Sequence, residues 1–182
     1  MPPRPPRPLI AVVGSARESP EEVKAAEELG RLLIDGGVKI ICGGLGGVMA
    51  GVCRGAAASP HWDDGSVIGV VPTYDLASGN PWLGTTIATG MGHGRNILVV
   101  ASARVVIAIG GRAGTLTEIA LAWSLGKPVL AVGTEQGWAS RLAGAKVDDR
   151  RDDHIHGPLS PAEAARLAIS LSQTSLPPSQ EF

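Results

Sequence analysis

The sequence predicts a doubly wound α/β fold, Rossmann-like, with a mainly parallel sheet and helices on both faces. Short apolar runs rich in β-branched residues alternate along the chain with segments whose apolar residues recur at helical spacing. Glycine follows several of these runs and occurs 25 times in 182 residues, as expected where tight turns join helices to a buried sheet. Because strand–helix–strand units close in a right-handed sense, their repetition builds a parallel sheet covered on both sides.

The first half of the chain predicts two strand–helix units and two further strands. The expected strands are residues 9–13, 38–42, 67–71 and 85–88. Pro20 begins the first helix, with acidic residues at the positive end of its dipole, and Gly36 and Gly37 end it. A second helix is expected over residues 48–58.

The second half continues the alternation. The expected strands are residues 105–109 and 128–132, and the expected helices are 97–102, a segment that begins at Leu116, and 161–171 with Ser160 as its N-cap. Residues 134–138 are expected to form a loop. The charged run DDRRDDHIH reads as a solvated loop, because two histidines two residues apart make a weak metal-binding pattern.

Length and composition limit the function classes. We expect one domain over residues 9–172, with a disordered proline-rich arm at 1–8 and a disordered tail at 173–182. A net charge of −1 and an aromatic content of 3% argue against a nucleic-acid partner. No apolar window is long enough for a membrane span, so a cytoplasmic protein is expected. Cys42 and Cys53 are expected to be buried free thiols, and no metal or separate cofactor is predicted.

Residues 105–132 contain the stretch around which we expect the site to form. A β-branched strand runs into Gly110, Gly111, Arg112, Gly114 and Thr115 and then into an apolar helix, the arrangement that points backbone N–H groups at a phosphate.

Glu118, in the helix after this loop, has two interpretations. Thr115 and Glu118 have the spacing of a capping box, in which the glutamate satisfies the N–H of the N-cap residue. Alternatively, the carboxylate faces the ligand and does acid–base or charge-stabilising work.

A second glycine cluster follows the strand at 38–42. Residues 43–47 read Gly-Gly-Leu-Gly-Gly and lead into the helix that contains Met49. Gly14 and Ser15 follow the first strand in the same way. Since the carboxyl ends of parallel strands collect at one edge of the sheet, we expect all three loops to meet at one ligand crevice. The candidate ligand-binding glycines of the second cluster are Gly43, Gly44, Gly46 and Gly47.

Arg95 lies at the start of the helix at 97–102, where a cation opposes the helix dipole. It is either a ligand-binding residue or a surface arginine paired with a carboxylate. The neighbouring His93 lies between two glycines and is interpreted as a loop residue.

Two of the predicted helices are apolar almost all round, over residues 97–101 and 116–125. A helix that lies on a sheet with its far side in water should show a polar face. We therefore expect these outer faces to meet a second copy of the chain in a homodimer or higher oligomer.

These motifs resemble the Lonely Guy (LOG) family and its relatives, long labelled lysine decarboxylase-like. The small bacterial branch related to molybdenum-cofactor carrier proteins is the most similar. The resemblance rests on the cluster at 43–49, on Gly94-Arg95-Asn96, and on the run from Gly110 to Glu118. It implies a nucleotide-binding Rossmann-like dimer, and in the LOG enzymes the cleavage of a nucleoside 5′-monophosphate to base and ribose 5-phosphate. By this resemblance Gly111, Gly114 and Thr115 hold the phosphate, and Arg95 and Glu118 are the catalytic pair.

Three residues depart from the LOG pattern. Arg112 stands where a glycine is usual, Asn96 where a lysine is usual, and Gly110 where a proline is usual. Arg112 either adds a cation for the phosphate or fills the space that the phosphate needs. The resemblance therefore transfers the fold more firmly than the hydrolase activity.

Two classes of function remain open at this point. As an enzyme, the protein is a phosphoribohydrolase that uses Glu118 and Arg95. As a carrier or sensor, it holds a nucleotide or a phosphorylated cofactor of the molybdenum-cofactor type without turnover. A pyridoxal-dependent lysine decarboxylase is rejected, because Lys127 lies between a helix end and a proline, where it cannot bear a Schiff base.

Overall fold

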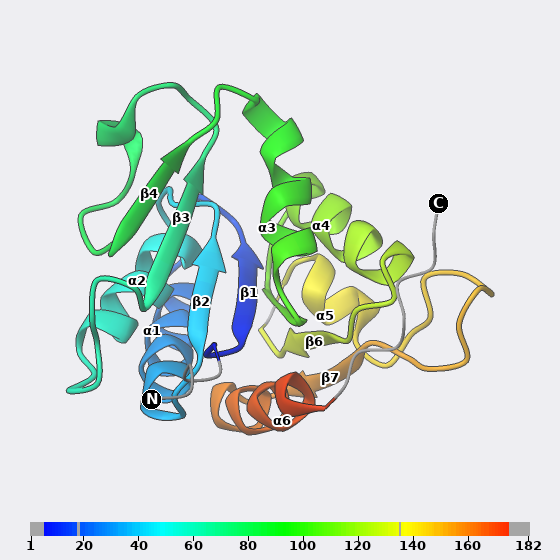
Figure 1. Cartoon of the computed structure of the whole chain (residues 1–182). Coiled ribbons are helices and arrows are strands. Elements are labelled where there is room, and N and C mark those ends of the chain that lie inside the picture. Colours follow the sequence, from blue (N-terminus) through cyan, green and yellow to red (C-terminus); the bar gives the residue numbers. More distant parts are fainter. Residues whose placement is uncertain (1–5, 18, 135, 175–182) are drawn as a thin grey trace.

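The computed structural model describes residues 6–17, 19–134 and 136–174, and Figure 1 shows their arrangement. The strands in this part of the chain are β1 Leu9–Gly14, β2 Lys39–Cys42, β3 Val67–Val71, β4 Thr85–Ala88, β5 Val105–Ile109, β6 Val129–Val132 and β7 His156–Leu159. The α-helices are α1 Pro20–Asp35, α2 Val48–Ala57, α3 Asn96–Ser102, α4 Ala113–Ser124, α5 Trp138–Leu142 and α6 Pro161–Gln173. Two 3₁₀ turns, η1 Leu76–Ser78 and η2 Gly92–Arg95, complete the described elements.

The described strands form one sheet in the order β4-β3-β2-β1-β5-β6-β7, and every neighbouring pair is parallel. The prediction of a doubly wound, Rossmann-like parallel sheet is confirmed. The chain steps outward from β1 to β4 and then returns to the other side of β1 as β5. This reversal is a topological switch point, outside which open α/β sheets form their ligand crevice.

Helices cover both faces of the sheet (Figure 1), and an apolar layer lies under each set of helices. Alternate strand residues point to opposite faces, so Ile10 and Val12 belong to the layer under α1, α2 and α6. Ala11 and Val13 belong to the layer under α3, α4 and α5. Both faces of the central strands are buried, which explains why these strands read as continuous apolar runs rather than as alternating ones.

The expected boundaries hold for most elements. α1 begins at Pro20 with Glu21 and Glu22 in its first turn, and Gly36 and Gly37 follow its last residue as predicted. α6 begins with the predicted Ser160 cap, whose hydroxyl accepts a hydrogen bond from the Glu163 N–H. The strand predicted at 105–109 coincides with β5.

Besides the 3₁₀ turns η1 and η2, one helix and one strand were not predicted from the sequence. Helix α5 extends from Trp138, at the end of the expected loop at 134–138. Strand β7 begins at His156, the last residue of the charged run that was expected to form a loop. β7 lacks an apolar run because it lies at the edge of the sheet, where only its pairing with β6 makes it a strand.

The chain ends bear on the expected arm and tail. Residues 1–5 and 175–182 lie outside the described residues. Within the expected arm, Arg7 is 2.9 Å from the Asp63 carboxylate, and the Pro8 carbonyl accepts a hydrogen bond from the Lys39 N–H. At the other end α6 includes Gln173, one residue beyond the expected domain boundary. No helix within the described ranges is long and apolar enough to span a lipid bilayer.

Candidate functional site

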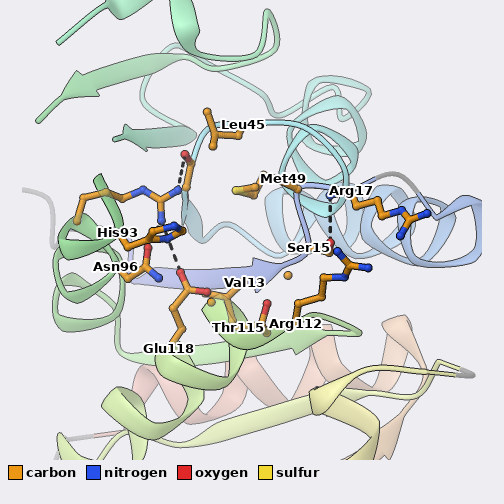
Figure 2. A pocket seen from close by; sticks show the side chains of 15 residues that line it. Val13, Ser15, Arg17, Leu45, Met49, His93, Asn96, Arg112, Thr115 and Glu118 are labelled. Carbon is orange, nitrogen blue, oxygen red and sulfur yellow. Dashed lines mark hydrogen bonds and ion pairs between the residues drawn. The ribbon is translucent and has the colours of Figure 1, made fainter. Parts of the chain in front are cut away.

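A pocket of about 290 Å³ opens at the switch point, outside the carboxyl ends of β1, β2 and β5. It is lined by the loop after β1, by the loop after β2, by η2 and by the first turns of α4. Figure 2 shows that Ser15, Arg17 and Arg112 lie at one end of this pocket, whereas His93, Asn96 and Glu118 lie at the other. The pocket therefore joins segments from both halves of the sheet.

Nine of the predicted site residues line this pocket. They are Gly14, Ser15, Gly43, Met49, Arg95, Arg112, Gly114, Thr115 and Glu118. The structure thus brings together the two residues expected to do chemistry and part of each glycine loop.

Arg95 and Glu118 form a buried ion pair at one end of the pocket. Their side chains are 8% and 7% exposed, and 3.8 Å separates the Arg95 Nη1 from the Glu118 Oε1. The Arg95 guanidinium also donates to the Gly43 carbonyl at 3.2 Å and to the Asn96 side-chain oxygen. The interpretation of Arg95 as a surface arginine is wrong, since the side chain is buried and its partner lines the pocket.

Burial dominates the protonation of this pair. It raises the pKa of Glu118 to about 7, while the nearby Arg95 acts in the opposite direction without cancelling the effect. Burial also lowers the pKa of Arg95. The Arg95 Nε has no hydrogen-bond partner among the described residues. At neutral pH Glu118 therefore exists in both its acid and its carboxylate form.

The start of α4 corrects the prediction for Thr115. The helix begins at Ala113 with Arg112 as its N-cap residue, and the Leu116 N–H already donates to the Arg112 carbonyl at 2.9 Å. Thr115 is therefore inside the first turn rather than the N-cap, and the capping box with Glu118 does not form. The reason is the Gly110-Gly111 turn, which has positive φ at both residues and lets the helix start earlier than Leu116.

The earlier start also frees Glu118. Because the side chain has no cap to satisfy, it points into the pocket instead (Figure 2). The first turn of α4 borders the pocket through Gly114 and Thr115. In the described part of the chain, no carbonyl or side chain accepts a hydrogen bond from the Gly114 or Thr115 N–H. The helix N-terminus is thus open toward the pocket, as anion binding requires.

Gly110 and Gly111 do not line this pocket. The Gly111 N–H interacts with the carboxylate of Glu22, which lies in the first turn of α1. The carbonyls of Gly110 and Gly111 accept hydrogen bonds from Ala139 and Trp138 at the start of α5. The polar backbone groups of these two glycines are therefore occupied by contacts with α1 and α5. The residues of this loop region that can contact a ligand in the pocket are Arg112, Gly114 and Thr115.

The second glycine cluster is divided in a similar way. Gly43 lines the pocket, but Gly44, Gly46 and Gly47 do not. A Cβ at Gly47 would lie 2.3 Å from the Ser15 carbonyl oxygen, and the Val48 N–H donates to that oxygen at 3.0 Å. The start of α2 is therefore covered by the loop after β1.

Six pocket residues were not among the predicted ones. They are Val13, Ala16, Arg17, Leu45, His93 and Asn96. The position of His93, two residues before Arg95 in the same turn, was the available signal for including it. Nothing local distinguished Arg17, whose place follows from the meeting of the loops after β1 and β5.

Cys42 and Cys53 are buried free thiols as predicted, with 3.7 Å between their sulfur atoms. Within residues 6–17, 19–134 and 136–174, no three or more His, Cys, Asp or Glu side chains cluster as metal ligands would.

Comparison with known proteins places this site in a family. Residues 7–163 match the model of the SLOG cluster4 family, a range that includes all of the residues lining the pocket. The chain belongs to the SLOG cluster4 family.

Three relatives of this SLOG protein are informative. An uncharacterized protein of Archaeoglobus fulgidus is 38% identical over 121 residues, which is 66% of this chain and 76% of the relative. The molybdenum cofactor binding protein of the phototrophic bacterium Rippkaea orientalis is 34% identical over 72% of this chain and 80% of its own, with a TM-score of 0.67. The molybdenum cofactor carrier protein of Chlamydomonas reinhardtii is 29% identical over 91% of this chain and 98% of its own, with a TM-score of 0.72.

Proposed function

We propose that this SLOG cluster4 protein binds a phosphorylated ligand of the molybdenum-cofactor type in the pocket at the switch point and carries it without turnover. The observation that carries the proposal is the pocket itself, with an open helix N-terminus and a cation at one end. The two structural relatives named for binding or carrying the molybdenum cofactor support the ligand class.

The phosphate of the ligand belongs at the start of α4. The N–H groups of Gly114 and Thr115 and the positive end of the helix dipole favour an anion there. Arg112 adds a cation on the same side of the pocket (Figure 2). Of the two roles that the sequence left open for Arg112, we therefore favour the one in which it binds the phosphate.

The organic part of the ligand belongs at the Arg95–Glu118 end. Leu45 and Met49 give that part of the pocket apolar surface for a flat ring. With a pKa of about 7, Glu118 can donate or accept a hydrogen bond near neutral pH. Both capacities fit a heterocycle that carries N–H and carbonyl groups.

Loading tests the carrier. The purified protein is mixed with molybdenum cofactor released from a molybdenum enzyme, and unbound cofactor is removed by gel filtration. We expect molybdenum and pterin fluorescence to elute with the protein, and Arg112→Ala to retain about tenfold less. Arg166→Ala, on the exposed side of α6, serves as the matched control. Elution of the wild-type protein without molybdenum or pterin would contradict the proposal.

A second candidate function is the phosphoribohydrolase that the LOG resemblance implies. The observation in its favour is the buried Glu118, which faces the pocket beside Arg95 at 3.8 Å. In this reaction water adds across the N-glycosidic bond: its hydroxyl joins the ribose carbon and its proton leaves with the base. The Glu118 carboxylate would orient that water and stabilise positive charge on the ribose.

Turnover separates the two candidates. The protein is incubated with a panel of nucleoside 5′-monophosphates, and released base is measured by chromatography. Release that disappears in Glu118→Gln while binding persists identifies the hydrolase. Binding without release, in both proteins, favours the carrier.

We also infer that a second copy of the chain packs on the outer faces of α3 and α4. The single chain covers Ile119, Ala122 and Trp123 of α4, but it leaves Leu98 of α3 39% exposed. We expect light scattering to give a dimer or larger assembly, and Leu98→Glu to shift it toward the monomer. Leu76→Glu, at an exposed position on η1, should leave the assembly unchanged.

A further inference from the structure

A second cavity adjoins the pocket on the Arg112 side. It has a volume of about 490 Å³ and lies between the start of α1, the Gly111 turn and the segment before α5. Its wall shares Ser15, Arg17 and Arg112 with the first pocket. The two cavities are therefore neighbouring chambers with three residues between them.

The shared wall is cationic. Arg17 and Arg112 both border the two chambers, and Figure 2 shows them at the same end of the first pocket. Among the described residues, neither arginine takes part in an ion pair. Both side chains are exposed and can rotate toward a ligand in either chamber. Two guanidinium groups on one wall can serve two phosphates.

The second chamber is also lined by two acidic residues. Glu21 and Glu22 line it, together with the amide of Gln136. The Glu22 carboxylate interacts with the Gly111 N–H, which fixes its position at the edge of the chamber. A terminal phosphate pushed into this chamber would meet two carboxylates, whereas hydroxyl or amino groups would find hydrogen-bond acceptors there.

The volumes of the two cavities also favour a ligand that extends into both. The first pocket, at about 290 Å³, lies just below the roughly 300–1,000 Å³ typical of ligand sites. The second chamber, at about 490 Å³, adds more volume to the site than the first pocket has. A ligand that uses both chambers is longer than a mononucleotide.

We propose that the two chambers form one site for a pyrophosphate-linked ligand. Its diphosphate lies along the Arg17–Arg112 wall, and a group rich in hydroxyl or amino donors occupies the second chamber against Glu21, Glu22 and Gln136. This inference rests on the proposed function, since it assumes that the first pocket binds a phosphorylated ligand. It narrows the ligand class to diphosphates whose second phosphate bears a sugar or a base.

Titration calorimetry with three probes tests the proposal. AMP carries one phosphate, ADP carries two with a free end, and ADP-ribose carries two with a sugar beyond them. We expect ADP-ribose to bind at least tenfold more tightly than either AMP or ADP. Equal affinity for AMP and ADP-ribose, or the tightest binding for ADP, would overturn the proposal.

A variant that fills the second chamber provides the structural control. Gln136→Trp should lower the affinity for ADP-ribose to that for AMP and leave the affinity for AMP within twofold of wild type. Gln173→Trp places the same new side chain at the exposed end of α6 and should change neither affinity. If Gln136→Trp keeps the preference for ADP-ribose, the second chamber is not used.

The outcome is separable from that of the proposed function. Loading of the molybdenum cofactor without any preference for ADP-ribose would overturn only the two-chamber site. Failure to load the cofactor, to bind AMP and to bind ADP-ribose would overturn both.

Discussion

The loops after β2 and β5 look alike in the sequence but differ in what approaches them. Both are glycine-rich, and both lead from a buried strand into a helix. In the loop after β2, the chain itself fills the space beside the glycines. The Val48 N–H at the start of α2 donates to Ser15, and the Asn80 amide donates to the carbonyls of Gly44 and Leu45.

In the loop after β5 the chain also contacts Gly110 and Gly111, but it leaves the first turn of α4 open. A Cβ added at Gly114 would meet no heavy atom within 4 Å, whereas one at Gly47 would meet backbone at 2.3 Å. A glycine cluster thus predicts that other atoms approach the backbone closely, but it does not show whether those atoms belong to the chain or to a ligand. The difference between the two loops makes α4, and not α2, the helix that can receive an anion.

Gly47→Ala should lower stability the most, because Gly47 lies in the loop after β2, where chain atoms fill the space beside the glycines. Gly47 has φ +57° and no room for a side chain. Left-handed strain and overpacking together should lower the free energy of unfolding by about 4 kcal/mol. Urea denaturation measures it. Gly114→Ala, in the open first turn of α4, should be neutral or stabilise by up to about 1 kcal/mol, and equal losses in the two variants would contradict the comparison.

Glu118→Gln should change the pH dependence of stability. Burial raises the pKa of Glu118 from the ordinary 4.5 of a glutamate carboxyl to about 7 in the folded protein, so between these values the folded state keeps a proton that the unfolded chain releases. The stabilisation is complete below pH 4.5 and is lost as pH rises through 7. About 1.4 kcal/mol per pKa unit gives a decline of about 3 kcal/mol.

Glu118→Gln should lack this part of the decline, as measured by urea denaturation of both proteins at pH 4.5, 6 and 8. Parallel curves for the two proteins would show that Glu118 titrates normally. The loop after β2 offers a contrast, because its helix brings the apolar Met49 to the pocket instead of an acid.

Arg112→Ala should weaken the binding of a phosphorylated ligand about tenfold, or about 1.4 kcal/mol, with little change in stability because the side chain is exposed. Arg112→Lys should restore part of the affinity, since the charge remains but the fork of donors does not. Calorimetry at two salt concentrations measures both. Tighter binding by the alanine variant would show that Arg112 blocks the phosphate.

Glu22→Gln should give the smallest effect. It weakens the contact with the Gly111 N–H but leaves an oxygen that can accept the same hydrogen bond. We expect a loss of about 1 kcal/mol or less in the free energy of unfolding. Glu28→Gln, farther along α1, is the matched control. If Glu22→Gln lowers stability more than Gly47→Ala does, the loop after β5 contributes more to stability than the loop after β2, contrary to the comparison.

The sequence predicted the architecture well because its signals are local. Apolar runs with glycine ends mark β1, β2 and β5, and the predicted α1 has its proline, acids and terminal glycines in the expected places. The pairing of Arg95 with Glu118 came from the family resemblance, and the structure places the two side chains within 3.8 Å.

Long-range contacts explain what was missed. Thr115 looked like an N-cap, but the docking of α5 against Gly110 and Gly111 fixes a turn that starts α4 earlier. The interaction of Glu22 with Gly111 joins residues far apart in the chain, so no spacing reveals it. Likewise β7 becomes a strand only through its neighbour β6.

The reversal of strand order between β1 and β5 has a consequence for how a ligand acts on the protein. β1 to β4 and β5 to β7 form two wings of the sheet, which meet along the β1–β5 ladder. The pocket takes Ser15 and Gly43 from one wing and Arg112 and Glu118 from the other. A bound ligand therefore contacts both parts of the sheet. It should stabilise both parts together and slow amide hydrogen exchange in each of them.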